Sequence, residues 1–170
     1  MATNIEIKAR VRDAAELHRR AADLSAGPGE LIAQEDVFFP VPQGRLKLRI
    51  FSPERGELIA YRRDDRPAAK TSEYAITPTH DPASLRATLA AALGVQIVVR
   101  KQRRLFRVGQ TRVHLDEVEG LGAFVELEYV LRPDEDRDRG AAEIARLMRL
   151  LDIRDEDLVA TAYADLLAGS

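Results

Sequence analysis

The sequence has 170 residues, contains no cysteine and no tryptophan, and carries charges that almost cancel. Without cysteine the chain forms neither disulfides nor a thiolate-ligated zinc site. A formal net charge of −2 provides no global field that would attract nucleic acid or an acidic membrane, so we expect neither partner. The most apolar stretch, residues 89–99, is broken by Gly94 and Gln96 and is too short to span a bilayer.

The beginning of the chain shows no secretory signal, because Met1 leads almost directly into a charged segment. We therefore expect a cytoplasmic protein. The length suits one domain, residues 1–170, with a substantial core. Charged residues still make up 32% of the chain, so any site for an anion must be local. A lined cavity fits this balance better than a basic surface does.

Charged residues alternate with apolar ones in several segments, and the two signs are kept apart. In residues 4–10, Glu6 and Lys8 lie on one face of a predicted strand, with isoleucines on the other. Further alternating charges are Arg45, Lys47 and Arg49; Lys101 and Arg103; and Glu126 and Glu128. One interpretation is a solvated sheet face, on which the signs would normally be mixed. Segregated signs favour a charged interior, which is costly unless a charged ligand and its counter-cation fill it.

The period-two segments predict eight strands, and the amphipathic segments predict four helices. The strands are expected near residues 4–10, 33–39, 45–51, 57–63, 71–77, 95–107, 111–118 and 123–132. The helices are expected after Asp13, after Asp81, and over residues 141–151 and 155–167, with a loop at 64–67. We predict an α+β fold, a closed eight-stranded antiparallel β-barrel with helices packed outside. Closure would turn the apolar faces outward under the helices and the charged faces inward.

Short motifs along nearly the whole chain resemble one known family. The first reads Asn4-x-Glu6-x-Lys8, and seven more follow in order at 34–39, 44–49, 57–63, 72–74, 101–103, 114–118 and 121–128. Together they resemble the CYTH-domain family, the triphosphate tunnel metalloenzymes, and most closely its class IV adenylyl cyclase branch. The family hallmark is Glu-x-Glu-x-Lys, so this chain departs from it at Asn4. The resemblance implies the same barrel, with a tunnel for a triphosphate.

A triphosphate calls for cations, because its recognition depends on positioning and on charge neutralisation. Arginine binds phosphate oxygens in bidentate fashion and lysine supplies a compact charge. The predicted phosphate-binding residues are Lys8, Lys47, Arg49, Lys101 and Arg103, followed by Arg10, Arg45, Arg63 and Arg112. For the second group, pairing with acids at the tunnel mouth is an equal alternative.

Carboxylates on the inward face provide oxygen ligands, which suit Mg²⁺ or Mn²⁺. Glu6, Glu126 and Glu128 are the predicted metal ligands, and the resemblance adds Asp116. Glu6, Lys8, Glu126 and Glu128 form the predicted catalytic set. For His114 a hydrogen-bonding role in the tunnel wall is favoured over metal ligation.

The resemblance favours one reaction and leaves two others open. The first is the class IV adenylyl cyclase reaction, which converts ATP to cyclic AMP and pyrophosphate. The second is hydrolysis of inorganic or thiamine triphosphate. The third is triphosphate or nucleotide binding without turnover, to which the change at Asn4 gives some weight. The expected partner is a nucleoside triphosphate or another polyphosphate, and a homodimer is left open.

Overall fold

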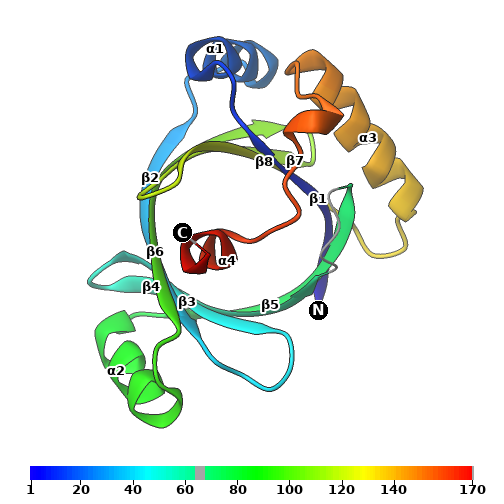
Figure 1. Cartoon of the computed structure of the whole chain (residues 1–170). Helices are drawn as coiled ribbons and strands as arrows, with labels where there is room; N and C mark the ends of the chain where they lie inside the picture. The colour runs from blue at the N-terminus through cyan, green and yellow to red at the C-terminus, as the bar shows by residue number, and fades with distance from the viewer. Residues whose placement is uncertain (64–67, 170) are drawn as a thin grey trace.

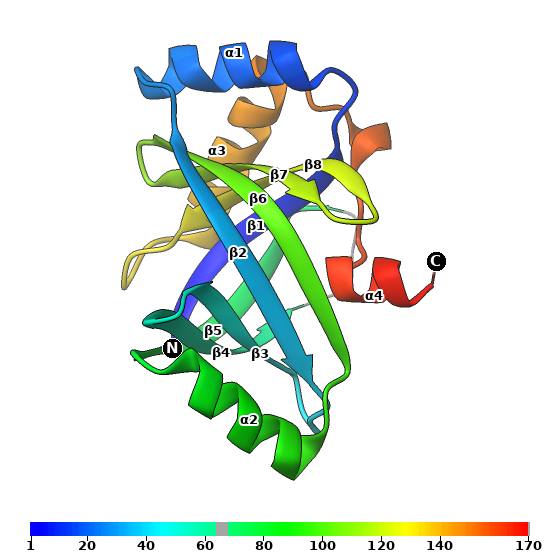
Figure 2. The same cartoon turned by 90° about the vertical axis from the view of Figure 1, so that its left-hand side faces the viewer.

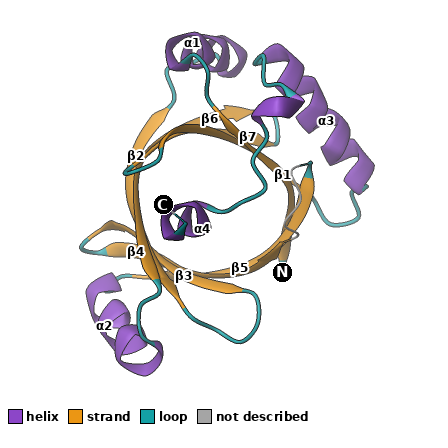
Figure 3. Cartoon of the chain, viewed as in Figure 1, coloured by secondary structure: helices purple, strands orange, loops and turns teal. Residues whose placement is uncertain are grey.

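The computed structural model describes residues 1–63 and 68–169, so the loop expected at 64–67 lies outside the described residues. Within them, eight strands form a closed antiparallel barrel (Figures 1 and 3). The strands are β1 (Ala2–Arg10), β2 (Glu30–Phe39), β3 (Arg45–Ser52), β4 (Arg55–Arg63), β5 (Lys70–Thr79), β6 (Ile97–Val108), β7 (Thr111–Val118) and β8 (Gly122–Val130). Their order is β1-β5-β4-β3-β2-β6-β7-β8, and β8 pairs again with β1. The predicted fold is confirmed.

Two clusters of the apolar core lie outside the barrel wall, between the strands and the helices, and a third packs inward-facing residues such as Phe38 and Val99 with Tyr163 of α4 (Tyr163–Ala168). Ile5 and Ile7 of β1 are buried against Ile144 and Leu147 of α3 (Arg137–Leu150). Residues of α1 (Ala14–Ser25) extend the same cluster. A second cluster packs β2 and β3 against α2 (Pro82–Leu93). The alternation along each strand therefore turns the charged positions toward the barrel interior.

The helices begin at the residues that favour a helix start. Asp13 caps α1 by accepting a hydrogen bond from the Glu16 amide, and Asp81 caps α2 in the same way. The third helix begins at Arg137, four residues before its predicted start at 141, behind the cap residue Asp136. Among the described residues, no helix combines the length and apolar character required to cross a bilayer.

The prediction of one helix over residues 155–167 is wrong. A 3₁₀ turn, η1 (Asp155–Asp157), is followed by extended chain and then by the short helix α4 (Tyr163–Ala168). The extended part pairs with β1, where the Val159 amide donates to the Lys8 carbonyl at 2.8 Å. Strand β5 covers β1 only as far as Glu6, so the rest of that edge is available for pairing. As a result α4 lies across one end of the barrel (Figures 1 and 2).

The close approach of α3 to the barrel depends on Gly140. A Cβ atom at this position would lie 2.9 Å from Ile5 Cγ1 and 3.0 Å from Tyr129 Cδ1. We expect Gly140→Ala to lower the free energy of unfolding by about 1–3 kcal/mol through overpacking, despite the better helix propensity of alanine. Gly27→Ala is the matched control, because a Cβ there meets nothing within 4 Å. Urea unfolding measures both, and equal stability of the two variants would refute the packing argument.

Candidate functional site

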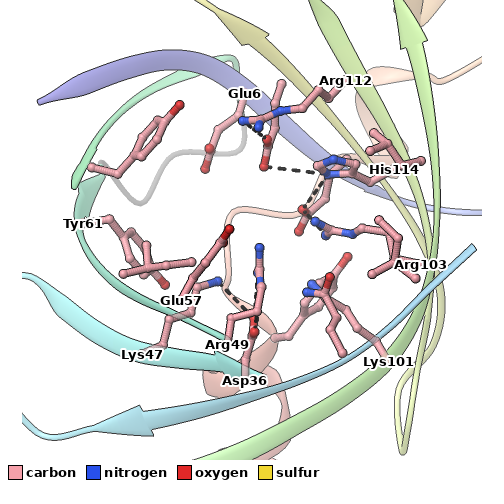
Figure 4. Close-up of a pocket in the computed structure, with 18 of the residues that line it drawn as sticks. Glu6, Asp36, Lys47, Arg49, Glu57, Tyr61, Lys101, Arg103, Arg112 and His114 are labelled. Carbon is pink, nitrogen blue, oxygen red and sulfur yellow. Dashed lines mark hydrogen bonds and ion pairs between the residues drawn. The ribbon is translucent and has the colours of Figure 1, made fainter. Parts of the chain in front are cut away.

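The barrel encloses a cavity of about 360 Å³ that is lined by residues from all eight strands. The volume lies in the range of ligand pockets. Charged side chains from opposite walls point toward the same space in the close-up (Figure 4). Tyr163, at the start of α4, also lines the cavity.

One wall carries two lysines and two arginines, Lys47, Arg49, Lys101 and Arg103, which we call the cationic wall. Asp36 accepts hydrogen bonds from Arg49 Nε and Nη2, both at 2.8 Å, and from Lys47 Nζ at 3.1 Å. Burial alone would raise the pKa of Asp36, but Arg49 and Lys47 outweigh it and hold the pKa well below its usual range. Burial, with Arg49 nearby, lowers the pKa of Lys47 to about 8.

Asp116 fixes the other half of the cationic wall. It accepts two hydrogen bonds from Arg103, at 2.7 and 2.6 Å, and lies 3.3 Å from Lys101 Nζ. The Tyr163 hydroxyl donates to the same carboxylate at 3.0 Å. Burial works against ionisation, yet Lys101 and Arg103 lower the pKa of Asp116 to about 2. Its oxygens thus bind the cationic wall, and Arg103 Nη2 bridges Asp116 and Glu126, at 2.6 and 2.9 Å. Among the described residues, the group whose ligand atoms lie close enough for one ion comprises His114, Glu126 and Glu128, and includes neither Asp116 nor Glu6.

Across the cavity from Lys47 and Arg49 lie three carboxylates, Glu6, Glu126 and Glu128, which we call the acidic wall (Figure 4). Arg103 joins the two walls, because its Nη2 atom donates to Glu126 at 2.9 Å. In the pairing of β1 with β8, Glu6 lies opposite Glu128, and Lys8 lies opposite Glu126. Burial, then Glu128 and Glu126, raises the pKa of Glu6 to about 7. Burial lowers the pKa of Lys8 to about 7, although Glu126 lies only 3.5 Å away. Burial also opposes ionisation of the other two carboxyls, but Lys8 outweighs it at Glu126, and His114 and Arg112 outweigh it at Glu128, so both pKa values are lowered. A bound cation would therefore favour ionisation of Glu6 most.

His114 stands at the edge of the acidic wall, opposite Glu126 in the pairing of β7 with β8. One potential ligand atom each from His114, Glu126 and Glu128 lie within 4.8 Å of one another. Burial and the charge of Arg103 lower the pKa of His114, although Glu128 and Glu126 oppose this shift. The side chain is part of the tunnel wall as predicted, but its Nδ1 atom has no hydrogen-bond partner among the described residues.

The second group of predicted phosphate-binding arginines is divided between the cavity and its surroundings. Arg63 and Arg112 line the cavity, 3.5 Å from Glu6 and 2.9 Å from Glu128 respectively. Arg45 pairs with Asp165 of α4 at 2.6 Å. Arg10 is exposed, lies over the Phe124 ring and does not line the cavity.

Three residues outside the predicted site also line the cavity, namely Asn4, Asp36 and Tyr163. Asn4 lines the cavity, as its strand parity indicated, and its buried Oδ1 atom has no hydrogen-bond partner among the described residues. Asp36 shares the inward parity of Gln34 and Phe38, which was a usable signal in the sequence. Tyr163 reaches the cavity only through the path of the C-terminal segment, and no periodicity indicated it.

Comparison with known proteins identifies the family. The model of the CYTH domain matches residues 2–163, and the chain belongs to this family. A curated protein of Methanocaldococcus jannaschii, named "putative adenylate cyclase", is 28% identical over 68 residues. That match covers 40% of this chain and 39% of the relative.

Several solved structures share this fold at low sequence identity. A protein of Pyrococcus horikoshii superposes with a TM-score of 0.83 at 23% identity and covers 96% of this chain and 98% of its own. A "putative adenylate cyclase" of Vibrio parahaemolyticus has a TM-score of 0.76 at 20% identity, with 97% of both chains covered. A "putative adenylyl cyclase" from Hippeastrum, described as having a dominant triphosphatase activity, has a TM-score of 0.66 at 16% identity, covering 100% and 97%. At these identities the likeness shows the fold.

Asp36 provides a test of whether the cationic wall is built for a polyanion. In Asp36→Asn, Lys47 and Arg49 lose their buried counter-charge, and we expect a loss of about 3–5 kcal/mol in the free energy of unfolding without ligand. Tripolyphosphate should then raise the melting temperature of the variant more than that of the wild type, because it replaces the missing charge.

The matched control for this test is Glu35→Gln. Glu35 neighbours Asp36 on β2 and also pairs with two arginines, Arg86 and Arg100, both at 2.7 Å, but outside the cavity. Its removal should cost about 1 kcal/mol or less and leave the shift caused by tripolyphosphate unchanged. A smaller shift in Asp36→Asn than in the wild type would contradict the account.

Proposed function

We propose that this protein is a metal-dependent enzyme that acts on a triphosphate inside the barrel, and that its reaction is the class IV adenylyl cyclase reaction. The observation that carries the proposal is that the cationic wall and the acidic wall line one and the same cavity. The cyclase name of the curated relative supports the choice of reaction. Hydrolysis of a triphosphate is the second candidate, favoured by the triphosphatase activity described for the Hippeastrum protein.

The cationic wall would hold the phosphates. Arg49 and Arg103 offer guanidinium groups for bidentate contacts, and Lys47 and Lys101 add compact charges beside them. Asp36 and Asp116 already fix these side chains through short hydrogen bonds, so binding requires little reorganisation. Arg63, Arg112 and Lys8 place further positive charge around the cavity. Arg45 and Arg10 are assigned no direct phosphate contact.

The acidic wall would hold Mg²⁺ or Mn²⁺ through Glu6, Glu126 and Glu128. The residues fit such an ion, because they offer carboxylate oxygens from two adjacent strands, and burial with the charges of Glu128 and Glu126 raises the pKa of Glu6. A divalent ion bound there lowers the pKa of an attacking hydroxyl and neutralises charge on the phosphates. Asp116 is left out of this set, since its oxygens accept hydrogen bonds from Arg103 and Tyr163.

The two candidate reactions differ in which phosphorus meets the nucleophile. In the cyclase reaction the ribose 3′-oxygen bonds to the α-phosphorus, the bond to the bridging oxygen breaks, and pyrophosphate leaves. In hydrolysis, water attacks the terminal phosphorus, the bond from that phosphorus to the bridging oxygen breaks, the diphosphate part of the substrate leaves, and orthophosphate forms. Both reactions require the protein to hold a linear polyphosphate between cationic side chains and a metal ion, and the residues that line the cavity support this arrangement.

Product analysis with ATP and with tripolyphosphate, each with Mg²⁺ and with Mn²⁺, tests the proposal. We expect cyclic AMP and pyrophosphate from ATP, and activity should stop when a chelator removes the metal. Glu128→Gln should reduce the rate by about a hundredfold or more, the scale of losing a group that acts on the reacting centre. Glu117→Gln is the matched control, because Glu117 is an exposed glutamate of the adjacent strand that lies outside the cavity.

The alternative outcomes identify the other functions. Orthophosphate as the product favours the triphosphatase. Tight binding of both compounds without any product favours a non-catalytic binding module. Full activity of Glu128→Gln, or activity that survives the chelator, contradicts the role of the acidic wall.

A further inference from the structure

His114 is a buried side chain with an unused coordinating atom. The residue is 4% exposed, and its Nδ1 atom has no hydrogen-bond partner among the described residues. An unpaired buried polar atom costs free energy, so its retention calls for an explanation. In Figure 4 the ring points toward the cavity between the acidic wall and Arg103.

The distances around Nδ1 are wrong for hydrogen bonds but close to those of shared coordination. Nδ1 lies 3.7 Å from an oxygen of Glu126 and 3.8 Å from one of Glu128. A hydrogen bond needs about 3 Å between the heavy atoms. Ligand atoms that bind one ion at about 2.1 Å lie roughly 3.0–3.5 Å apart, depending on the geometry. The three potential ligand atoms lie within 4.8 Å of one another, so side-chain adjustments could bring them onto a common ion.

Arg103 lies beside the ring and donates to Asp116 and, at 2.9 Å, to Glu126 Oε2. This is the same oxygen that lies 3.7 Å from Nδ1, so an ion bound there would share it with Arg103. A neutral imidazole has one nitrogen lone pair to offer, and Nδ1 is the atom that faces the carboxylates.

We propose that His114 Nδ1 is a metal ligand together with Glu126 and Glu128, and that the site therefore selects a divalent transition ion such as Mn²⁺ over Mg²⁺. Mg²⁺ prefers an all-oxygen shell, whereas an imidazole nitrogen favours first-row transition ions. Asn4 strengthens the preference, because it adds no charge with which to hold a strongly hydrated Mg²⁺. The inference rests on the proposed function and specifies the class of ion at its acidic wall.

The test is metal binding by the protein itself, without turnover. Pulsed electron paramagnetic resonance of Mn²⁺ bound to the wild type should show coupling to a ¹⁴N nucleus, and the signal should become that of ¹⁵N when only the histidines are ¹⁵N-labelled. Competition titration should show tighter binding of Mn²⁺ than of Mg²⁺. In His114→Gln the nitrogen coupling should vanish, and the affinity for Mn²⁺ should fall by about tenfold or more while that for Mg²⁺ changes little.

His80→Gln is the matched control, because His80 is exposed and lies outside the cavity; it should retain the wild-type signal and affinities. The labelled wild type decides the case even if His114→Gln does not fold. Mn²⁺ bound at the acidic wall without histidine coupling overturns this inference and leaves the proposed function standing. No Mn²⁺ binding, with or without tripolyphosphate, overturns both.

Discussion

The structure depends on the pairing of buried cations with two buried acids. Asp36 and Asp116 each hold one arginine and one lysine of the cationic wall in place. Without these acids, four positive charges inside one barrel would repel one another at a cost that the apolar core outside the wall would have to offset. The same pairs fix the cations in the geometry that a polyphosphate requires. Stability and recognition therefore have the same physical basis in this protein.

The C-terminal segment is a second constraint on the cavity. The Lys8 and Lys70 ammonium groups donate to the carbonyls of Thr161 and Ala160, at 3.3 and 2.9 Å. Lys8 also lies 3.7 Å from the centroid of the Tyr163 ring, close enough for a cation–π contact. These contacts tie the segment to the tunnel charges and place α4 across one end of the barrel. A change in the charge of Lys8 or Lys70 would thus weaken the contacts that hold the C-terminal segment.

Much of the fold and part of the site could be predicted from strand alternation. Glu6, Lys8 and Glu128 line the cavity because the pleat has a period of two, and that period survives barrel closure. Arg10 follows the same alternation but lies at the end of β1, beyond the cavity. Strand alternation predicts which face a side chain is on, but not how far along the barrel axis it lies. The pairing of Asp116 with Arg103 depends on which strands become neighbours, which the sequence pattern leaves open. The C-terminal helix is shorter than predicted, because Leu158 pairs with the edge of β1 instead of continuing the amphipathic helix.

The central claim is that a triphosphate lies between the two walls with a divalent ion on the acidic side. Its most direct test is a crystal structure of the protein with tripolyphosphate and Mn²⁺, with the ion located by its anomalous scattering. The account predicts a strong anomalous peak about 2.0–2.3 Å from oxygens of Glu126 and Glu128, with phosphate oxygens against Arg49 and Arg103. Tripolyphosphate bound outside the barrel, or Mn²⁺ bound away from these carboxylates, would contradict it.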